Sequence, residues 1–283
     1  MNRGKRVLFL DLKDEKGKEE LRGLIRGTDV FLHNWDLGPL GFGPAEVLAL
    51  NPRAVVGSVT GFDAGTPDAG RPALDMLAQA ASGLMALTGP AGGDPVRCGV
   101  PVSDLAAGLY AAIGILAALE ERHRSGKGRI VETSLMASSL GLLTYQASRW
   151  FMTGREPERL GNAHATIVPY DSYATADGSV VIAVANDPAF LRLCEALERP
   201  DLASDPRFAT NPLRVEHRGI LEPELAKAVR LLPTSEMESR CRRLEVPCGP
   251  VRSVSQALAG LSELPFPLRF PGGRTMNPAW PAS

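Results

Sequence analysis

The residue best suited to covalent chemistry is a single carboxylate, Asp104, in the segment Gly99-Val-Pro-Val-Ser-Asp104. It precedes a long run of Ala, Gly, Leu and Ile, which predicts a helix that starts near it. The unpaired N–H groups and the positive dipole end of a first helical turn favour a negative charge. We therefore expect Asp104 to be ionised near neutral pH and usable as a nucleophile. An acid in a first turn can equally be a helix cap, and the pattern alone leaves that role open.

The helix that follows Asp104 is expected to be buried on every side. Its residues are almost all apolar as far as Leu119, so it has no polar stripe to turn towards water. This run also comes nearest to a transmembrane span, but its glycines and its charged ending, Glu120-Glu-Arg-His-Arg124, favour a core helix. We expect no membrane-spanning segment.

Other catalytic patterns are missing from the sequence. A dinucleotide loop starting at Gly41 would need glycine where Glu46 stands, and there is no GxSxG motif for a serine hydrolase. The four cysteines show no CxxC spacing, and the four histidines are scattered singly. We expect no metal site and no permanently bound cofactor.

Composition narrows the class of partner. The 283 residues carry 31 Lys and Arg against 32 Asp and Glu, a formal charge of −1, so no nucleic-acid partner is expected. The chain opens with Met-Asn-Arg-Gly-Lys-Arg and continues without the apolar core of a signal peptide. Together with the cysteine pattern, this predicts a reducing, cytoplasmic setting.

The first half of the chain alternates strand-like and helix-like segments, which is typical of a parallel α/β sheet. Strands are expected at residues 7–12, 29–32, 54–60 and 129–133, and helices at 15–27, 44–50, 75–85, after Asp104 and at 134–152. After a Gly-, Pro- and charge-rich stretch, a hairpin at 170–175 and 180–185 is expected around Asp177-Gly178. Helices at 188–197, 213–231 and 235–244 complete a smaller α+β domain.

Two strand ends offer groups for an anionic ligand. Lys13 follows the first expected strand, and Asn34-Trp35 follows the second. Ligands of open α/β sheets bind at the carboxyl ends of strands, so these side chains are expected to line a cleft. A solvated lysine and a loop capped by asparagine explain the same residues, and composition does not decide between the two interpretations.

A series of segments makes the chain similar to the class III CoA-transferases, the family of carnitine and bile-acid CoA-transferases. In order, they are Asn2-Arg-Gly-Lys-Arg6, Asp11-Leu-Lys13, Asn34-Trp35, Asn51-Pro-Arg53, Gly61-Phe62, Arg71-Pro-Ala-Leu-Asp75, Gly99 to Gly108, Ser125-Gly-Lys-Gly-Arg129, Gly161-Asn-Ala-His164, Ile167-Val-Pro-Tyr170 and Val246-Pro-Cys-Gly-Pro250. No single match is decisive, but their joint order is specific.

The resemblance implies a covalent mechanism. Asp104 matches the family's nucleophilic aspartate, whose carboxylate attacks an acyl-CoA to give a mixed anhydride and then an aspartyl-CoA thioester. The acceptor acid then repeats these steps in reverse, with water kept out. Asp75 matches an acid near the active site.

The resemblance also implies substrates and a fold. Lys13, Asn34 and Trp35 match positions that contact CoA, and Arg71 lies beside another. CoA thioesters and a small carboxylic acid are the implied substrates, with segments 161–170 leaning towards succinyl-CoA or another dicarboxylyl-CoA. The implied fold is a Rossmann-like open sheet plus a small α+β domain in an interlocked homodimer. We assign residues 1–155 to the large CoA-binding domain, 163–258 to the small domain and 259–283 to an extended tail.

The chain departs from the family pattern at both ends. The usual first strand with its CoA-contacting loop, a segment between Ala257 and Leu264, and the final helix have no counterpart. Two alternatives to a CoA-transferase therefore stay open. An α-methylacyl-CoA racemase is one, although Leu74 stands where that branch has a histidine, which removes a base. The other is a catalytically incomplete CoA-binding chain, or a partner subunit of a more complete paralogue.

Overall fold

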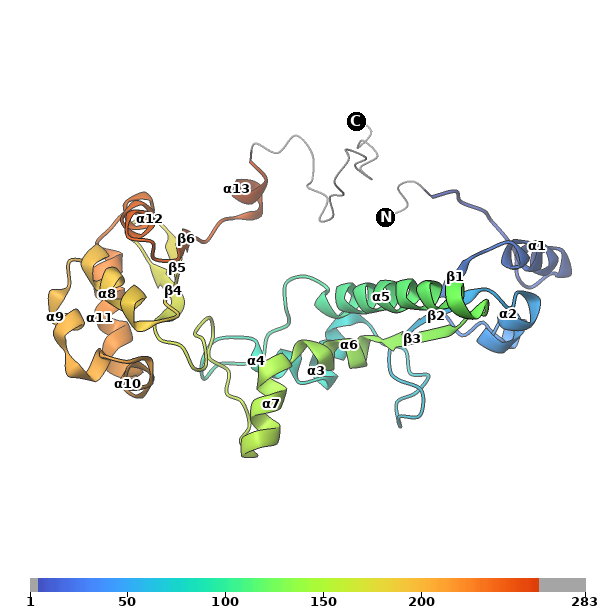
Figure 1. Ribbon diagram of the computed structural model, residues 1–283, viewed down its shortest axis with the longest axis horizontal. Coiled ribbons are helices and arrows are strands. Elements are labelled where there is room, and N and C mark those ends of the chain that lie inside the picture. The colour runs from blue at the N-terminus through green and yellow to red at the C-terminus, as the bar shows by residue number, and fades with distance from the viewer. Residues whose placement is uncertain (1–4, 260–283) are drawn as a thin grey trace. The chain divides into compact units, whose positions relative to one another are not determined.

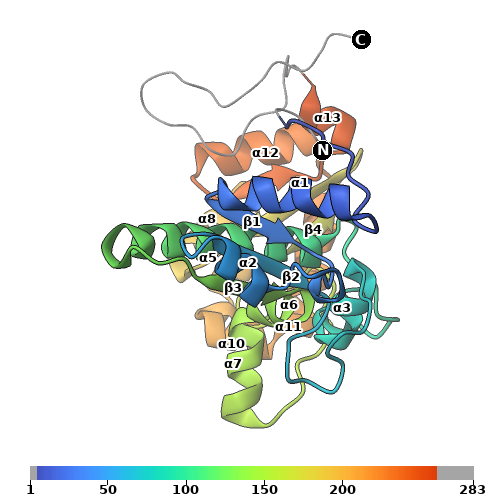
Figure 2. The same ribbon diagram turned by 90° about the vertical axis from the view of Figure 1, so that its right-hand side faces the viewer.

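The computed structural model describes residues 5–259, which form two compact units with a division between Gly161 and Asn162 (Figures 1 and 2). The first unit contains a parallel sheet and the second an antiparallel one. The expected class, an α/β domain with a smaller α+β domain, is confirmed. Of the expected tail, residues 260–283 lie outside the described residues.

The first unit is built on a three-stranded parallel sheet of β1 (Val30–His33), β2 (Val55–Thr60) and β3 (Ile130–Ser134), with β2 in the centre. Gly57 in β2 has no side chain, and a Cβ there would come within 3.0 Å of Ile115. This close approach lets α5 (Val102–Ser125) lie directly along one face of the sheet, as Figure 1 shows. The residue before Gly57 in β2, Val56, packs with α1 (Glu15–Arg26) and α2 (Pro44–Leu50) instead.

Three expectations for the first unit are wrong. Residues 7–12 form no strand, and Val7, Leu8 and Phe9 are exposed, because no described strand pairs with them. The helix expected at 75–85 is interrupted at Gly83, whose φ of 82° is left-handed, giving α3 (Asp75–Ala81) and α4 (Leu84–Leu87). The helix expected at 134–152 divides at Thr144, whose φ is 45°, into α6 (Leu135–Leu142) and α7 (Thr144–Thr153).

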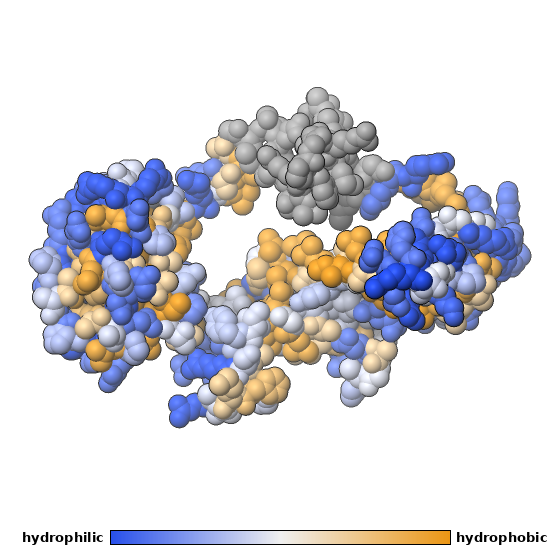
Figure 3. Space-filling model, in the orientation of Figure 1, coloured by the Kyte–Doolittle hydropathy of each residue, from blue (hydrophilic) through white to orange (hydrophobic). Residues whose placement is uncertain are grey.

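The expectation that the Asp104 helix is buried on all sides is also wrong. Small residues of α5, among them Ala107 and Ala111, are buried against the sheet and α6. The opposite side carries an apolar stripe, Leu105, Leu109, Ile113 and Leu116, each more than half exposed. Figure 3 shows this stripe as a hydrophobic area over α5. We call these four residues the α5 stripe.

By length and composition, α5 is the one described helix able to cross a membrane. This is weak evidence for a membrane span, because the helix that forms the core of a folded enzyme passes the same test. The contacts of α5 with β2, β3 and α6 give its buried side a role in the fold.

The second unit contains an antiparallel sheet of β4 (Tyr170–Ala174), β5 (Ser179–Ala183) and β6 (Cys248–Pro250). The hairpin of β4 and β5 is confirmed, but neither Asp177 nor Gly178 in its turn has a positive φ. Asp177 instead accepts hydrogen bonds from the N–H (2.8 Å) and hydroxyl (2.7 Å) of Thr234, which fastens the turn to the start of α12 (Thr234–Arg243).

Helices cover this sheet and supply most of its core. They are α8 (Asp187–Ala196), α9 (Pro200–Ser204), α10 (Asn211–Glu216), α11 (Arg218–Arg230) and α12 (Thr234–Arg243). A short exposed helix, α13 (Val254–Leu258), follows β6 and adds nothing to this core. Short 3₁₀ turns lie at Gly38–Leu40 in the first unit and at Pro206–Phe208 in this one. The helix expected at 213–231 is divided at His217, and β6 was not foreseen.

A fully buried cation organises the second unit. The guanidinium of Arg214 donates to the carbonyls of Val168 (2.7 Å) and Phe208 (3.0 Å) and to the carboxylate of Asp187 (2.8 Å). It also lies 4.6 Å from the centre of the Phe190 ring. A buried charge is tolerated only when it is paired and hydrogen-bonded, and here each partner comes from a different segment.

Replacement of Arg214 by Met is expected to lower the free energy of unfolding of the second unit by about 3 kcal/mol, because it leaves the buried carbonyls without this donor and Asp187 without its charged partner. Arg207→Met, which removes an exposed ion pair with Asp205, is the matched control. It should change the free energy of unfolding by about 1 kcal/mol or less. Urea unfolding with hydrogen-exchange mass spectrometry of residues 162–259 measures both. Equal effects of the two variants would contradict this account.

Candidate active site

The first turn of α5 is capped by a carboxylate from another helix. Asp75, the first residue of α3, accepts a hydrogen bond from the backbone N–H of Ser103 at 2.9 Å. The N–H groups of a first helical turn have no partner within the helix, so an acid from outside can satisfy one. Asp104 follows Ser103 directly, and the hydrogen bond therefore brings the two candidate acids close together.

A second residue of α3 completes the surroundings of Asp75. The side-chain amide of Gln79 donates through Nε2 to Asp75 Oδ2 at 2.7 Å, and its Oε1 accepts from the N–H of Cys98 at 2.8 Å. Gln79 is fully buried. Asp75 thus accepts a hydrogen bond on each of its oxygens.

Buried hydroxyls fasten the same turn to α6. The hydroxyl of Ser139 lies 2.7 Å from that of Ser103 and 2.7 Å from the carbonyl of Leu135. Both serines are buried. The start of α5 is therefore held from α3 on one side and from α6 on the other.

A tight loop sets where α3 begins. A Cβ at Gly61, which directly follows β2, would lie 2.5 Å from the Cβ of Ala73, so only glycine fits there. The carbonyl of Gly61 accepts from the N–H of Met136 at 3.1 Å, and Asp63 accepts from the hydroxyl of Ser134 at 2.8 Å. These contacts connect the loop that leads to Asp75 with the end of β3.

The carboxylate of Asp104 is the one member of this group without a bonded partner. Across residues 5–259, no hydrogen bond or ion pair engages it, and the residue is exposed. Partial loss of hydration raises the pKa of Asp104 above its ordinary value, and the negative charge of Asp75 raises it further. Both effects act against the positive end of the helix dipole, which by itself favours the ionised form of Asp104. The result is an accessible carboxylate that is more basic than usual.

The other candidate residues lie apart from this pair. Lys13 and Asn34 are exposed in loops, and Trp35 is 76% exposed just beyond β1. Arg71 forms an ion pair with Asp68 and lies 5.6 Å from the ring centre of Phe62. Among the described residues, none of the four forms a hydrogen bond or ion pair with Asp75 or Asp104. Of the six candidates, the structure therefore brings together the two acids.

Sequence reasoning missed Gln79, Ser103 and Ser139. For Gln79 a signal existed, because it stands four residues after Asp75 and so shares a helical face with it. The serines offered none, since a serine in an apolar helix is equally suited to packing or to a hydrogen bond with its own backbone.

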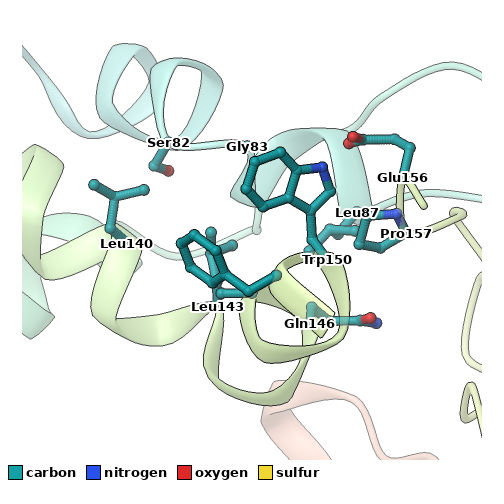
Figure 4. A pocket seen from close by; sticks show the side chains of 11 residues that line it. Ser82, Gly83, Leu87, Leu140, Leu143, Gln146, Trp150, Glu156 and Pro157 are labelled. Carbon is teal, nitrogen blue, oxygen red and sulfur yellow. The ribbon is translucent and has the colours of Figure 1, made fainter. Parts of the chain in front are cut away.

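The first unit also contains a cavity of about 330 Å³ at the other end of α3, between the α3–α4 junction and α7 (Figure 4). Its walls are mostly apolar, with Leu87, Leu143 and Trp150, and Glu156 is the one charged residue in its lining. Neither Asp75 nor Asp104 contributes to the lining, so this cavity is separate from the acid pair.

The chain is similar to known proteins of one family. The model of "CoA-transferase family III" matches residues 1–262. The human succinyl-CoA:glutarate CoA-transferase is 34% identical over 92% of this chain, and the succinate–glutarate CoA-transferase of Agrobacterium fabrum is 36% identical over 91%. The chain spans 60% and 65% of the length of these two curated relatives.

A solved structure also resembles the chain. The crystal structure of a CaiB/BaiF family protein from Brucella suis superposes with a TM-score of 0.83 and 33% identity. The alignment covers 96% of this chain and 76% of that protein.

Substitution of Asp75 by Asn is expected to lower the pKa of Asp104, because it removes the negative charge that disfavours ionisation of its neighbour. The fall should stop short of the ordinary value, since partial burial, the larger cause, remains. NMR titration of ¹³Cγ-labelled aspartates measures it, with the Asp104 signal assigned by its loss in Asp104→Asn. Asp68→Asn serves as the control and should leave the titration unchanged. An unchanged or raised pKa in Asp75→Asn would show that the two acids do not interact.

Proposed function

The chain belongs to CoA-transferase family III, and from that premise we propose that it transfers CoA from an acyl-CoA donor to a carboxylic acid through Asp104. The observation that carries the proposal is the Asp104 carboxylate itself. It is accessible and raised in pKa, it forms no hydrogen bond with the residues that the structure describes, and it lies at a helix start that two other helices hold in place. A nucleophile needs this combination of freedom and fixed position.

The reaction balances without an added proton or cofactor. A carboxylate oxygen of Asp104 attacks the thioester carbonyl, the C–S bond breaks, and CoA leaves as a thiolate from a mixed anhydride. The thiolate then attacks the aspartyl carbonyl, the anhydride C–O bond breaks, and the donor acid leaves as a carboxylate. The acceptor carboxylate reverses both steps on the aspartyl-CoA thioester. A raised pKa of Asp104 favours the first attack, because a more basic carboxylate is the better nucleophile.

The donor we propose is succinyl-CoA or another dicarboxylyl-CoA. Support comes from segments 161–170 and from the names of the two curated relatives, which act on succinyl-CoA or succinate and on glutarate. For CoA itself, we propose that Trp35 stacks on the adenine and that Lys13 and Arg71 meet phosphates, with Asn34 beside them. Arg71 would exchange its ion pair with Asp68 for the ligand.

The racemase alternative is less well supported. It needs a second proton-transferring group, and the position before Asp75 is occupied by Leu74, which is exposed and not titratable. Asp75 does not replace that group readily, since both of its oxygens already accept hydrogen bonds.

The α5 stripe supports a proposal about assembly. Four large apolar side chains in a row on one helix mark a surface that another chain or segment covers. We propose that a second copy of this chain covers it, as in the interlocked homodimer that the resemblance implies. A heteromer with a more complete paralogue is the alternative. We place the protein in the cytoplasm, in keeping with its four free cysteines.

Incubation with succinyl-CoA is expected to convert Asp104 into a trappable thioester. Hydroxylamine should turn it into a hydroxamate and borohydride into an alcohol, both located by peptide mass spectrometry. Asp104→Ala should lose the modification, and Asp68→Asn, another acid of the same unit, should keep it. Label at a different residue, or none on protein shown to be folded, would overturn catalysis by this chain alone.

Substitution of Ile113 by Glu is expected to dissociate the assembly, because it places a charge in the middle of the α5 stripe. Sedimentation velocity should show the wild type above single-chain mass and Ile113→Glu at single-chain mass. Leu231→Glu, at an equally exposed apolar residue of the second unit, is the matched control and should sediment as the wild type. A wild type of single-chain mass at all concentrations would contradict self-association through α5.

A further inference from the structure

We propose that Gln79 is a positioning residue that acts through Asp75: its amide fixes the Asp75 carboxylate in place and so fixes the position of a negative charge beside Asp104. The inference deepens the proposed function of Asp104 and rests on it. The inference comes from the hydrogen bonds around Gln79. There, two backbone N–H groups determine which side-chain atoms accept and which donate.

The orientation of the Gln79 amide follows from Cys98. The backbone N–H of Cys98 can only donate, and it lies 2.8 Å from one end of the amide, which must therefore be the oxygen. The NH₂ end is then the one that lies 2.7 Å from Asp75 Oδ2. A flipped amide would place two donors against each other at Cys98. Gln79 thus presents a donor to Asp75 in the one orientation that its surroundings allow.

The other oxygen of Asp75 is fixed in the same way. The N–H of Ser103, also an obligatory donor, lies 2.9 Å from Oδ1. Both oxygens therefore face donors. The pair of donors fixes the orientation of the Asp75 carboxylate. The donor to Oδ1 is a backbone N–H, which does not depend on the side chain at that position. The donor to Oδ2 is the side chain of Gln79, and a substitution can remove it.

Few other charges act on this site. Among the elements packed around it, α4, α6 and β2 carry no charged residue, and α3 carries Asp75 alone. The remaining charged or titratable groups on β3 and the nearby loops are Glu132, Asp63, Asp68, Arg71, Asp94, Arg97 and Cys98. Asp63 is bound to Ser134, Asp68 to Arg71, and Arg97 donates to the Cys98 carbonyl at 3.1 Å. Asp75 is the group whose charge acts on Asp104.

The consequence for chemistry is a more basic nucleophile. An anionic Asp75 makes ionised Asp104 less stable and so more reactive towards a thioester carbonyl. If the Asp75 carboxylate turned away, that repulsion would weaken and Asp104 would titrate as a more ordinary acid. Gln79 therefore affects Asp104 without touching it, through the charge of the residue between them.

Two variants test the inference by shifting Asp104 in different ways. Gln79→Met keeps the side-chain length but removes the donor, so the Asp75 carboxylate loses one of the two hydrogen bonds that hold it beside Asp104. We expect the pKa of Asp104 to fall below that of the wild type, but not below that of Asp75→Asn. Gln79→Glu, while protonated, still accepts from Cys98 and donates to Asp75, and once ionised it adds a negative charge. We expect it to keep the pKa of Asp104 at or above the wild-type value.

The measurement is NMR titration of ¹³Cγ-labelled aspartates in the full chain, together with the pH dependence of Asp104 labelling by succinyl-CoA and hydroxylamine. Gln146→Met, in the cavity at the other end of α3, is the matched control and should shift neither. A residue that only stabilises the fold would reduce the labelling yield without moving its acid midpoint. That result, or a pKa unchanged in Gln79→Met or lowered in Gln79→Glu, would overturn the inference.

The titration also separates this inference from the proposed function. If the wild type forms no adduct at Asp104, the proposed function fails, but the NMR titration still reports whether Gln79 controls the ionisation of the acid pair. If Gln79→Met unfolds in the acid range, Gln79→Glu decides: a pKa of Asp104 at or above wild type supports the inference, and a lower one overturns it.

Discussion

The candidate site depends on one hydrogen bond, from the N–H of Ser103 to the carboxylate of Asp75. It satisfies a helix N-terminus with an acid from a different helix, and so defines where α5 begins relative to α3. A local cap, such as a serine before the helix, would have satisfied the same N–H group without bringing a second negative charge near Asp104. The tertiary cap therefore does two things at once: it fixes the proposed nucleophile in space, and its negative charge adds to the rise in pKa that partial burial causes.

Helix α5 links this site to the rest of the fold. Its buried alanines and Gly114 permit close packing on the sheet, where a Cβ at Gly114 would come within 2.7 Å of Val131. The same helix turns the α5 stripe away from the sheet. A helix with two apolar sides needs two partners, and the described residues supply one of them. Its start holds the acid pair, so whatever covers the stripe also lies along the helix that carries the nucleophile.

Sequence patterns predicted the elements that depend on local signals. The alternation of strands and helices gave the parallel sheet, and the apolar run after Asp104 gave α5. The predictions failed where tertiary contacts determine the local structure. Residues 7–12 have the pattern of a strand but no partner strand, and the hairpin turn is held by Asp177 and Thr234 rather than by left-handed backbone. The burial of α5 was overestimated because apolar composition shows that a surface must be covered, not which chain covers it.

The site illustrates the same limit at the level of single residues. Asp104 was identified by its place at a helix start and Asp75 by its match to a family motif, whereas the connection between them runs through Gln79 and Ser103, which match no chemical pattern. Their function depends on which atoms they face: an amide against Cys98 can only donate to Asp75, and a backbone N–H can only donate. These constraints appear once the helices are placed in space. In this protein a candidate nucleophile can be proposed from the sequence, but the environment that affects its basicity is a property of the packing of α3 against α5.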